Sequence, residues 1–468
     1  MNSIKHLLSA LVALILYLVI PYGDNTIWCI VCFVMFLYIS YDLLKDDIKH
    51  KDYLSFNSIF LISFFLTSFA FPVFILSSNE LFSQYVDMNF LVQFVDFKYL
   101  SRGVFLCLLA ISVYAAAYKI NHKKQVLHKK DAIHKRIFKK NTIDISLLLL
   151  LIATIYNAYY SLKSFDVTNL QQNAYVYDLL KAGLVVSFIV RIPNIRKEPS
   201  FTDNFICFFK YNRYPLIISF ISILLFLYFG VRNLAISIII IDLMTMVVYY
   251  SRLSIKYIVF LSIVGVLILF VIRETRHSDT SIMNSGVSSA IASTNLKISS
   301  PLLFFSDLIA ASTELSLGVE IKDRNGLQHP EQIILVPLVP LPLLPTLVSE
   351  NIWGKSYQEA TGSSVLNDYM LQRYGKNATY GKHCVSDLYM KWGVLGIIVF
   401  FVILGWLTSK ADSNKHNNIF WAAAYLALLS LSFFTPRDSL LGVIRPIFYV
   451  CVFLWLFSRK QSLKNKLI

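Results

Sequence analysis

The feature that most constrains this chain is a series of apolar segments long enough to cross a lipid bilayer. A bilayer-spanning helix needs roughly 17–25 apolar residues. Twelve segments of about this length lie near 6–22, 27–44, 55–77, 99–118, 145–162, 177–193, 214–230, 233–250, 257–272, 385–408, 418–434 and 442–458. Because lipid offers the backbone no hydrogen-bond partners, each segment is expected to be a helix. The sequence therefore predicts an all-α polytopic membrane protein.

Composition supports this class and argues against several others. The 468 residues are 56% hydrophobic and only 15% charged, which is more apolar than a soluble protein of this size can easily bury. The net charge of +15 does not indicate a nucleic-acid partner, because the basic residues lie mostly in short loops between apolar segments. No phosphate-binding or dinucleotide-binding glycine motif occurs, and no Cys/His group has zinc spacing. We expect no cofactor and no metal.

Lysine and arginine predict the orientation, because cytoplasmic loops of membrane proteins are enriched in them. The 119–144 loop holds nine Lys or Arg, and the tail from Arg459 adds four. The alternate short loops hold one each, at Lys98, Lys163 and Arg437. We expect a multi-pass protein with both termini in the cytoplasm, and we expect the 119–144 loop to contact anionic lipid.

The segment 273–384 divides the chain into three parts. Residues 1–272 are expected to hold nine spans, and residues 385–468 to hold three spans and a basic tail. The 112 residues between them carry nine Lys or Arg and ten Asp or Glu, so they form a nearly neutral island on the outer side. Two apolar stretches in it, 301–319 and 333–348, contain charged residues or four prolines. We expect these stretches to lie on the membrane surface or to dip into it.

Arginines at the outer ends of spans are the candidate anion-binding residues. An Arg beside a helix N-terminus suits phosphate, because the guanidinium fork and the helix dipole both favour negative charge. The candidates are Arg232 in a tight turn that opens a span, Arg273 and Arg276 after the ninth span, Arg437 in the last outer turn, and Arg445 in the first turn of the last span. The alternative for each is an interfacial side chain that reaches to water.

Four charged residues near these positions complete the cationic pattern. Asp438 is expected to pair with Arg437 or Arg445. Lys181, Asp242 and Lys391 lie near or within spans, where a charge is costly and usually faces a partner or a cavity. The sequence does not identify the partner of Asp242.

A second group of residues could supply a general base and contacts to a sugar. The candidate bases are His277, Glu359, His383 and Asp387, whose side chains can take a proton from a hydroxyl. Tyr380 and Lys382, at the end of the island, are candidates for stacking on a sugar and for binding its phosphate. The alternative for each is an ordinary solvated loop residue.

Four short segments resemble the bacterial O-antigen and oligosaccharide repeat-unit polymerases of the Wzy type. They are Phe229-Gly-Val-Arg232-Asn-Leu-Ala235, the proline run Val336 to Pro345 followed by Trp353-Gly-Lys355, Ser386-Asp-Leu-Tyr-Met-Lys-Trp-Gly393-Val-Leu-Gly396, and Thr435-Pro-Arg437-Asp-Ser. The layout of many spans, one large late outer loop and two or three closing spans is also similar to that family.

The resemblance implies a glycosyltransferase with a GT-C-like architecture in the bacterial inner membrane. Its substrates would be oligosaccharides linked to undecaprenyl diphosphate, joined at the periplasmic face into O-antigen or a related surface polysaccharide. A chain-length regulator is an expected partner. Two alternatives share parts of the layout: an O-antigen ligase, and a flippase or transporter of lipid-linked oligosaccharide. The transporter is less favoured, because the chain has only 16 glycines and no internal repeat.

Overall fold

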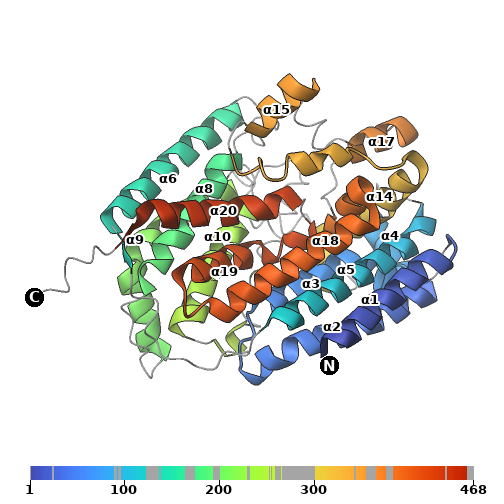
Figure 1. The fold of residues 1–468 in the computed structure, drawn as a ribbon, viewed down its shortest axis with the longest axis horizontal. Coiled ribbons are helices and arrows are strands. Elements are labelled where there is room, and N and C mark those ends of the chain that lie inside the picture. The colour runs from blue at the N-terminus through green and yellow to red at the C-terminus, as the bar shows by residue number, and fades with distance from the viewer. Residues whose placement is uncertain are drawn as a thin grey trace, which may run out of the picture.

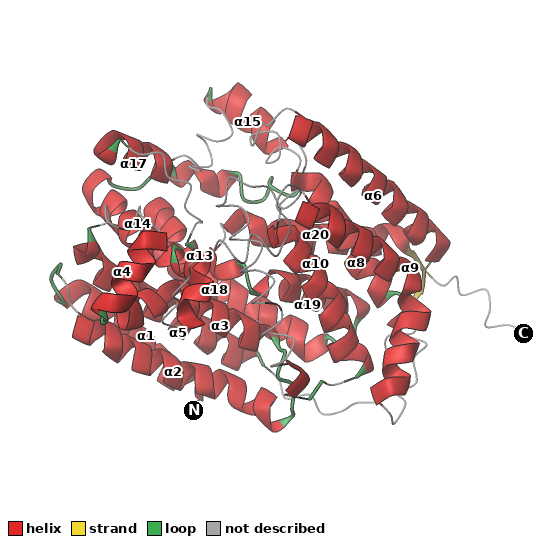
Figure 2. Ribbon diagram, turned by 180° about the vertical axis from the view of Figure 1, so that it is seen from behind, coloured by secondary structure: helices red, strands yellow, loops and turns green. Residues whose placement is uncertain are grey.

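The fold is a bundle of helices, seen from two opposite sides in Figures 1 and 2. The structure is a computed structural model. It describes residues 2–23, 26–88, 92, 96–122, 136–138, 140–163, 174–192, 201–228, 232–251, 253–254, 256–258, 265, 301–341, 344–354, 365–375, 383–437 and 440–460.

Eleven of the twelve expected spans coincide with described helical segments. These are α1 (Asn2–Val19), α2 (Thr26–Lys49), α3 (Phe56–Ser68) with η1 (Phe71–Ile75), α5 (Leu100–Asn121), α6 (Lys140–Lys163), α8 (Ala174–Ile189), α9 (Phe201–Tyr228), α10 (Arg232–Thr245) with η6 (Met246–Tyr250), α18 (Cys384–Asn414), α19 (Ile419–Ser432) and α20 (Leu440–Phe457). Six of these are long and apolar enough to cross a membrane, and four more are shorter apolar helices. The twelfth, 257–272, lies almost wholly outside the described residues, so the count of twelve stays a prediction.

The remaining described elements are short. They are α4 (Asn79–Met88), η3 (Phe97–Tyr99), η7 (Pro301–Phe305), α13 (Ser306–Ile309), α14 (Ala311–Asn325), η8 (Pro330–Ile334), α15 (Leu344–Trp353), α17 (Val365–Tyr374), η9 (Thr435–Arg437), and two strands, β1 (Arg136–Phe138) and β2 (Ser458–Lys460). The strands pair antiparallel, so the expected 119–144 loop meets the C-terminal tail.

One end of the bundle, which we call the terminal end, carries both chain termini and the loops that the charge pattern assigns to one side. His6 near the N-terminus hydrogen-bonds Asp42 near the end of α2, at 2.9 Å. Lys415, after α18, bonds Asp52 in the α2–α3 loop at 3.3 Å. The β1–β2 pair brings the C-terminal tail next to the residues that precede α6. These contacts agree with the alternation expected from the basic loops.

The opposite end, which we call the island end, carries the described helices of the 273–384 segment. α14 packs against α5 and α18 and is buried from Ala311 to Ile321. Its approach to α18 is close, since a Cβ on Gly318 would lie 1.8 Å from Ser386 Oγ. By contrast, three apolar side chains in η8 and α15 are at least half exposed: Ile333, Leu347 and Ile352. The 301–319 stretch thus enters the bundle in part, whereas the 333–348 stretch leaves apolar side chains outside it.

α18 is broken at Gly393, and the break connects it to the island. Gly393 has φ 65° and ψ −155°, a backbone conformation almost restricted to glycine. The carbonyl of Met390, freed from the helix ladder, accepts the N–H of Gln328 at 2.8 Å. The indole N–H of Trp392 donates to Pro330 O at 3.0 Å. The short first part of α18 is therefore held by the loop that follows α14.

We predict that Gly393→Ala lowers the free energy of unfolding by about 1–3 kcal/mol, because alanine is strained at this φ and ψ. Thermal unfolding of the detergent-purified protein measures the effect. Gly265→Ala is the control, since an added Cβ there meets no atom of the described residues within 4 Å and the backbone φ is ordinary. Equal melting temperatures for the two variants would contradict the strain at Gly393.

Candidate functional site

The N-termini of three helices lie together at the island end. Arg445 of α20 bonds Asp178 of α8 at 3.2 Å, which places the second turns of these helices side by side. The ring of Tyr177 in α8 packs edge-on against Phe226, near the end of α9, with centroids 5.4 Å apart. Since α10 starts four residues after α9 ends, its N-terminus is also here. The three helices thus begin on the same side of the bundle, where their dipoles are positive.

Among the described residues, Arg445, Lys181 and Asp178 form a group with more positive than negative charge. Asp178 accepts both Arg445 and Lys181, whose Nζ lies 2.7 Å from Asp178 Oδ1. Two cations and one carboxylate leave one net positive charge on three largely buried side chains. The Arg445 guanidinium also lies 4.3 Å from the Tyr175 ring centroid. Its Nε–H is buried and has no hydrogen-bond acceptor among the described residues. A buried donor with surplus charge suits an anionic ligand.

Of the other arginines predicted from the sequence, the structure describes the side chain of Arg437, only the backbone of Arg232, and neither Arg273 nor Arg276. α10 begins at Arg232, as the tight-turn motif predicts, but only the backbone of this residue is described. Arg437 ends η9, which contacts α3, α18 and α19, and its side chain is partly exposed. Asp438 lies outside the described residues, and the described partner of Arg445 is Asp178. Arg273 and Arg276 also lie outside them.

His383 caps the start of α18 and is fully buried. The backbone N–H of Val385 donates to its Nδ1 at 3.3 Å, so the other ring nitrogen carries the proton. That Nε2–H donates to Ser68 Oγ, 3.1 Å away at the end of α3. Burial lowers the pKa of the His383 imidazole from its usual 6.5 to about 3. The ring is therefore neutral and joins α18 to α3; action as a base would require it to exchange one of these partners.

Asp387, one turn further along α18, forms a buried ion pair. Lys391 Nζ lies 2.7 Å from Asp387 Oδ1 and donates to Oδ2 at 2.9 Å. The i, i+4 spacing lets the two residues meet on one helix face. Next to them, the Ser386 hydroxyl donates to Glu314 O of α14 at 3.1 Å. The charged residue that the sequence flagged at position 391 thus neutralises the carboxylate that it flagged at 387.

A hydrogen-bonded cluster around Asp323 was not predicted from the sequence. Asp323 accepts the hydroxyls of Tyr389 and Tyr22, each at 2.8 Å. Arg102 lies 3.5 Å from the same carboxylate and donates to the Tyr22 hydroxyl at 2.7 Å. The cluster joins the ends of α1, α5, α14 and α18. Its members are far apart in sequence, and no local spacing marks them.

A second unpredicted cluster holds α17 at the same end. Arg373 pairs with the buried Glu320 of α14, and Arg324 binds the same carboxylate at 3.1 Å. The Arg373 guanidinium also lies 5.2 Å from the centroid of the Tyr374 ring. These contacts fasten a helix of the island over α14.

The remaining predicted residues cannot be placed. His277, Glu359, Tyr380 and Lys382 lie outside the described residues, so their roles stay predictions. Within the described part of the chain, no three His, Cys, Asp or Glu side chains gather as metal ligands.

We predict that acidification destabilises the protein through His383. Below pH 6.5 the unfolded imidazole binds a proton that the buried ring refuses down to about pH 3, so stability falls as pH falls through this window. The loss from pH 7 to pH 5 is expected to be about 2 kcal/mol. Thermal unfolding at both pH values should show a smaller pH effect in His383→Asn, which retains a capping side chain.

The exposed His50 provides the matched control for this experiment. His50→Asn should keep the wild-type pH dependence. An unchanged pH dependence in His383→Asn would show that another group causes the acid destabilisation.

Comparison with known proteins gives one match. The family model described as O-antigen polysaccharide polymerase Wzy matches residues 6–466. Searches of curated proteins and of solved structures each found no match.

Proposed function

The chain belongs to the O-antigen polysaccharide polymerase Wzy family, membrane proteins that join lipid-linked oligosaccharide repeat units, and from this premise we propose how it holds its substrates. The family assignment favours polymerase over the ligase and transporter alternatives. The proposal concerns the orientation of the bundle, the lipid carrier and the residues that bind it.

We place the terminal end in the cytoplasm and the island end at the periplasmic face of the inner membrane. The support is the distribution of Lys and Arg. The loops and tail that meet at the terminal end include the nine cationic residues of 119–144 and the basic C-terminus. The described island helix α14 then packs at the periplasmic ends of α5 and α18.

The donor is the growing chain on undecaprenyl diphosphate, with its diphosphate bound near Arg445. The observation that supports this assignment is the largely buried Arg445 side chain near the starts of α8 and α20: its Nε–H has no acceptor among the described residues, and with Asp178 and Lys181 it carries one net positive charge. Backbone N–H groups at helix N-termini are suited to phosphate oxygens. Arg232, at the start of α10, and Arg437 would bind the second phosphate or the incoming carrier lipid. Arg273 and Arg276 remain candidates for the same task.

The reaction is an exchange of one glycosidic oxygen for another. A hydroxyl of the incoming repeat unit bonds to the anomeric carbon, and the bond from that carbon to the diphosphate oxygen breaks. The hydroxyl proton goes to a base, and the negative charge stays on the leaving diphosphate, where arginines stabilise it. His277, Glu359, His383 and Asp387 remain the candidate bases. His383 and Asp387 would first have to exchange the partners that they have in the structure.

Two further features of the proposal come from the family. A chain-length regulator would bind the polymerase from the periplasmic or membrane side. Island helices such as α17, fastened by Arg373 and Glu320, would cover the site and hold the reacting groups together. Tyr380 and Lys382 are the predicted sugar contacts within the same island.

We predict that Arg445→Ala lowers polymerisation at least a hundredfold, because a cation aimed at the leaving group is lost. Arg445→Lys should restore only part of the activity, since lysine keeps the charge but not the guanidinium fork. The measurement is the surface-polysaccharide ladder of a deletion strain complemented with each variant. Protein abundance in the membrane is measured in parallel.

The matched control for Arg445 lies at the other end of α8 and its neighbours. Arg191 pairs with Asp144 across two helix ends, as Arg445 pairs with Asp178, but at the terminal end. Arg191→Ala should therefore leave the ladder in place per molecule of protein, even where abundance falls. A normal ladder in Arg445→Ala would remove Arg445 from the site.

We also predict that Arg232→Ala abolishes the ladder while the protein still inserts at normal abundance, and that Arg232→Lys rescues it only partly. A ladder reduced to single-repeat bands is the expected result. Full-length chains in Arg232→Ala would show that the start of α10 does not bind the diphosphate.

A further inference from the structure

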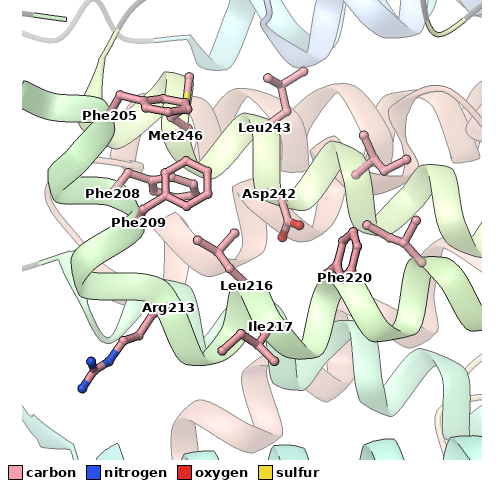
Figure 3. A pocket seen from close by; sticks show the side chains of 12 residues that line it. Phe205, Phe208, Phe209, Arg213, Leu216, Ile217, Phe220, Asp242, Leu243 and Met246 are labelled. Atoms are coloured by element: carbon pink, nitrogen blue, oxygen red, sulfur yellow. The ribbon is translucent and has the colours of Figure 1, made fainter. Parts of the chain in front are cut away.

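A groove lies between α9 and α10. Its cavity measures about 620 Å³, within the range of small-molecule pockets. Figure 3 shows four phenylalanines and several aliphatic side chains along it, with Asp242 at its centre and the guanidinium of Arg213 directed away from Asp242 at its edge. Along α9, Arg213 lies between two apolar parts of the lining: Phe205, Phe208 and Phe209 precede it, and Leu216, Ile217, Phe220 and Ile223 follow it.

A bend in α9 shapes this groove. Asn212 has non-helical backbone angles, φ −113° and ψ 16°, and Pro215 follows three residues later. The Asn212 amide donates to Phe208 O at 2.9 Å and to the Tyr250 hydroxyl at the end of η6. Proline bends a helix by removing a backbone hydrogen bond. The residues before Asn212 thus turn away from the axis of the rest of α9, and the end of α10 is tied to the bend.

The lining faces the bilayer rather than the protein interior. Phe205, Phe209, Phe220 and Ile217 are 40–62% exposed in the isolated chain, and both walls belong to helices apolar enough to span a membrane. Apolar space that is open to a bilayer is filled by hydrocarbon. The groove therefore accepts the chain of a lipid.

Asp242 and Ser219 close the deep part of the groove. The Ser219 hydroxyl is 3.0 Å from Asp242 Oδ1, so the two helices are linked near the middle of the expected spans. The distance along α9 from Arg213 to Ile223, the last lining residue, is ten residues, or about 15 Å. A polar link beneath an apolar groove gives it a defined depth.

Two exposed cations, Arg213 and Lys210, lie close together in α9 at the groove. Arg213 lines the groove, and Lys210 lies one helical turn before it. Both are near the terminal end, because the neighbouring Tyr214 donates to Asp144 O at 2.9 Å. We propose that this groove binds an anionic phospholipid, with one acyl chain along Leu216, Ile217 and Phe220 and the phosphate at Arg213 and Lys210.

The lipid is distinct from the polymerase substrate. The diphosphate site proposed above is at the island end, whereas Arg213 is at the terminal end. The separation of the two lipids rests on the proposed function, because that proposal places the substrate at the island end. The groove and its charged residues do not depend on that proposal. A lipid bound here would come from the cytoplasmic leaflet, if the terminal end faces the cytoplasm as proposed.

The test uses the full-length protein in nanodiscs that contain equal amounts of phosphatidylglycerol and phosphatidylcholine, followed by native mass spectrometry after mild delipidation. The expected result is one retained phosphatidylglycerol per chain. In K210Q/R213Q, retention should fall about thirtyfold, from the loss of two cations at a membrane surface. Leu243→Trp, which fills the groove and keeps both cations, should also lose the lipid.

Lys5→Gln is the matched control, since Lys5 is an exposed cation at the terminal end outside the groove, and it should retain the lipid. Equal retention of phosphatidylcholine, or unchanged retention in K210Q/R213Q, would overturn the proposal. Preferential retention of added undecaprenyl phosphate over phosphatidylglycerol would also overturn it. Because lipid retention is measured and not polymerisation, these results do not depend on the catalytic assignments.

Discussion

The pairing of charges inside an apolar bundle is the constraint on which the rest of this structure depends. A lone charge among membrane helices is costly, so each one must find a partner or face a cavity. The described residues include three such pairs: Asp387 with Lys391, Asp144 with Arg191, and Asp412 with Lys415. The Asp144–Arg191 pair joins α6 to the end of α8, whereas the other two pairs are local to α18 and the residue that follows it.

The same constraint applies to Arg445, which shares with Arg102 a buried Nε–H that has no acceptor among the described residues. The Arg445 side chain is largely buried, and its partner Asp178 is shared with Lys181. Asp178, Arg445 and Lys181 together carry one net positive charge near the first residues of α8 and α20. An anionic substrate would complete the pairing, which is the physical link between the fold and polymerisation of diphosphate-linked sugars.

The two ends of the bundle differ in structure and in proposed role. At the island end, the Asp323 and Glu320 clusters fix α14 and α17 against α1, α5 and α18. At the terminal end, a bent α9 leaves a groove that suits a structural lipid. The bend in α9 is at Asn212 and Pro215, near the terminal end. The break in α18 is at Gly393, near the island end.

The sequence by itself determined the class, the membrane segments and the family. Apolar length alone predicted eleven segments that the structure shows as helices, because backbone hydrogen bonding in lipid allows few alternatives. It also marked Arg445, Lys391 and Asp242 as buried charges that need partners. Only the tertiary structure identified those partners as Asp178, Asp387 and Ser219. Of these, only the 387–391 pair is local; the others, like Asp323 with Arg102, join different helices, and no sequence period records which helices are neighbours.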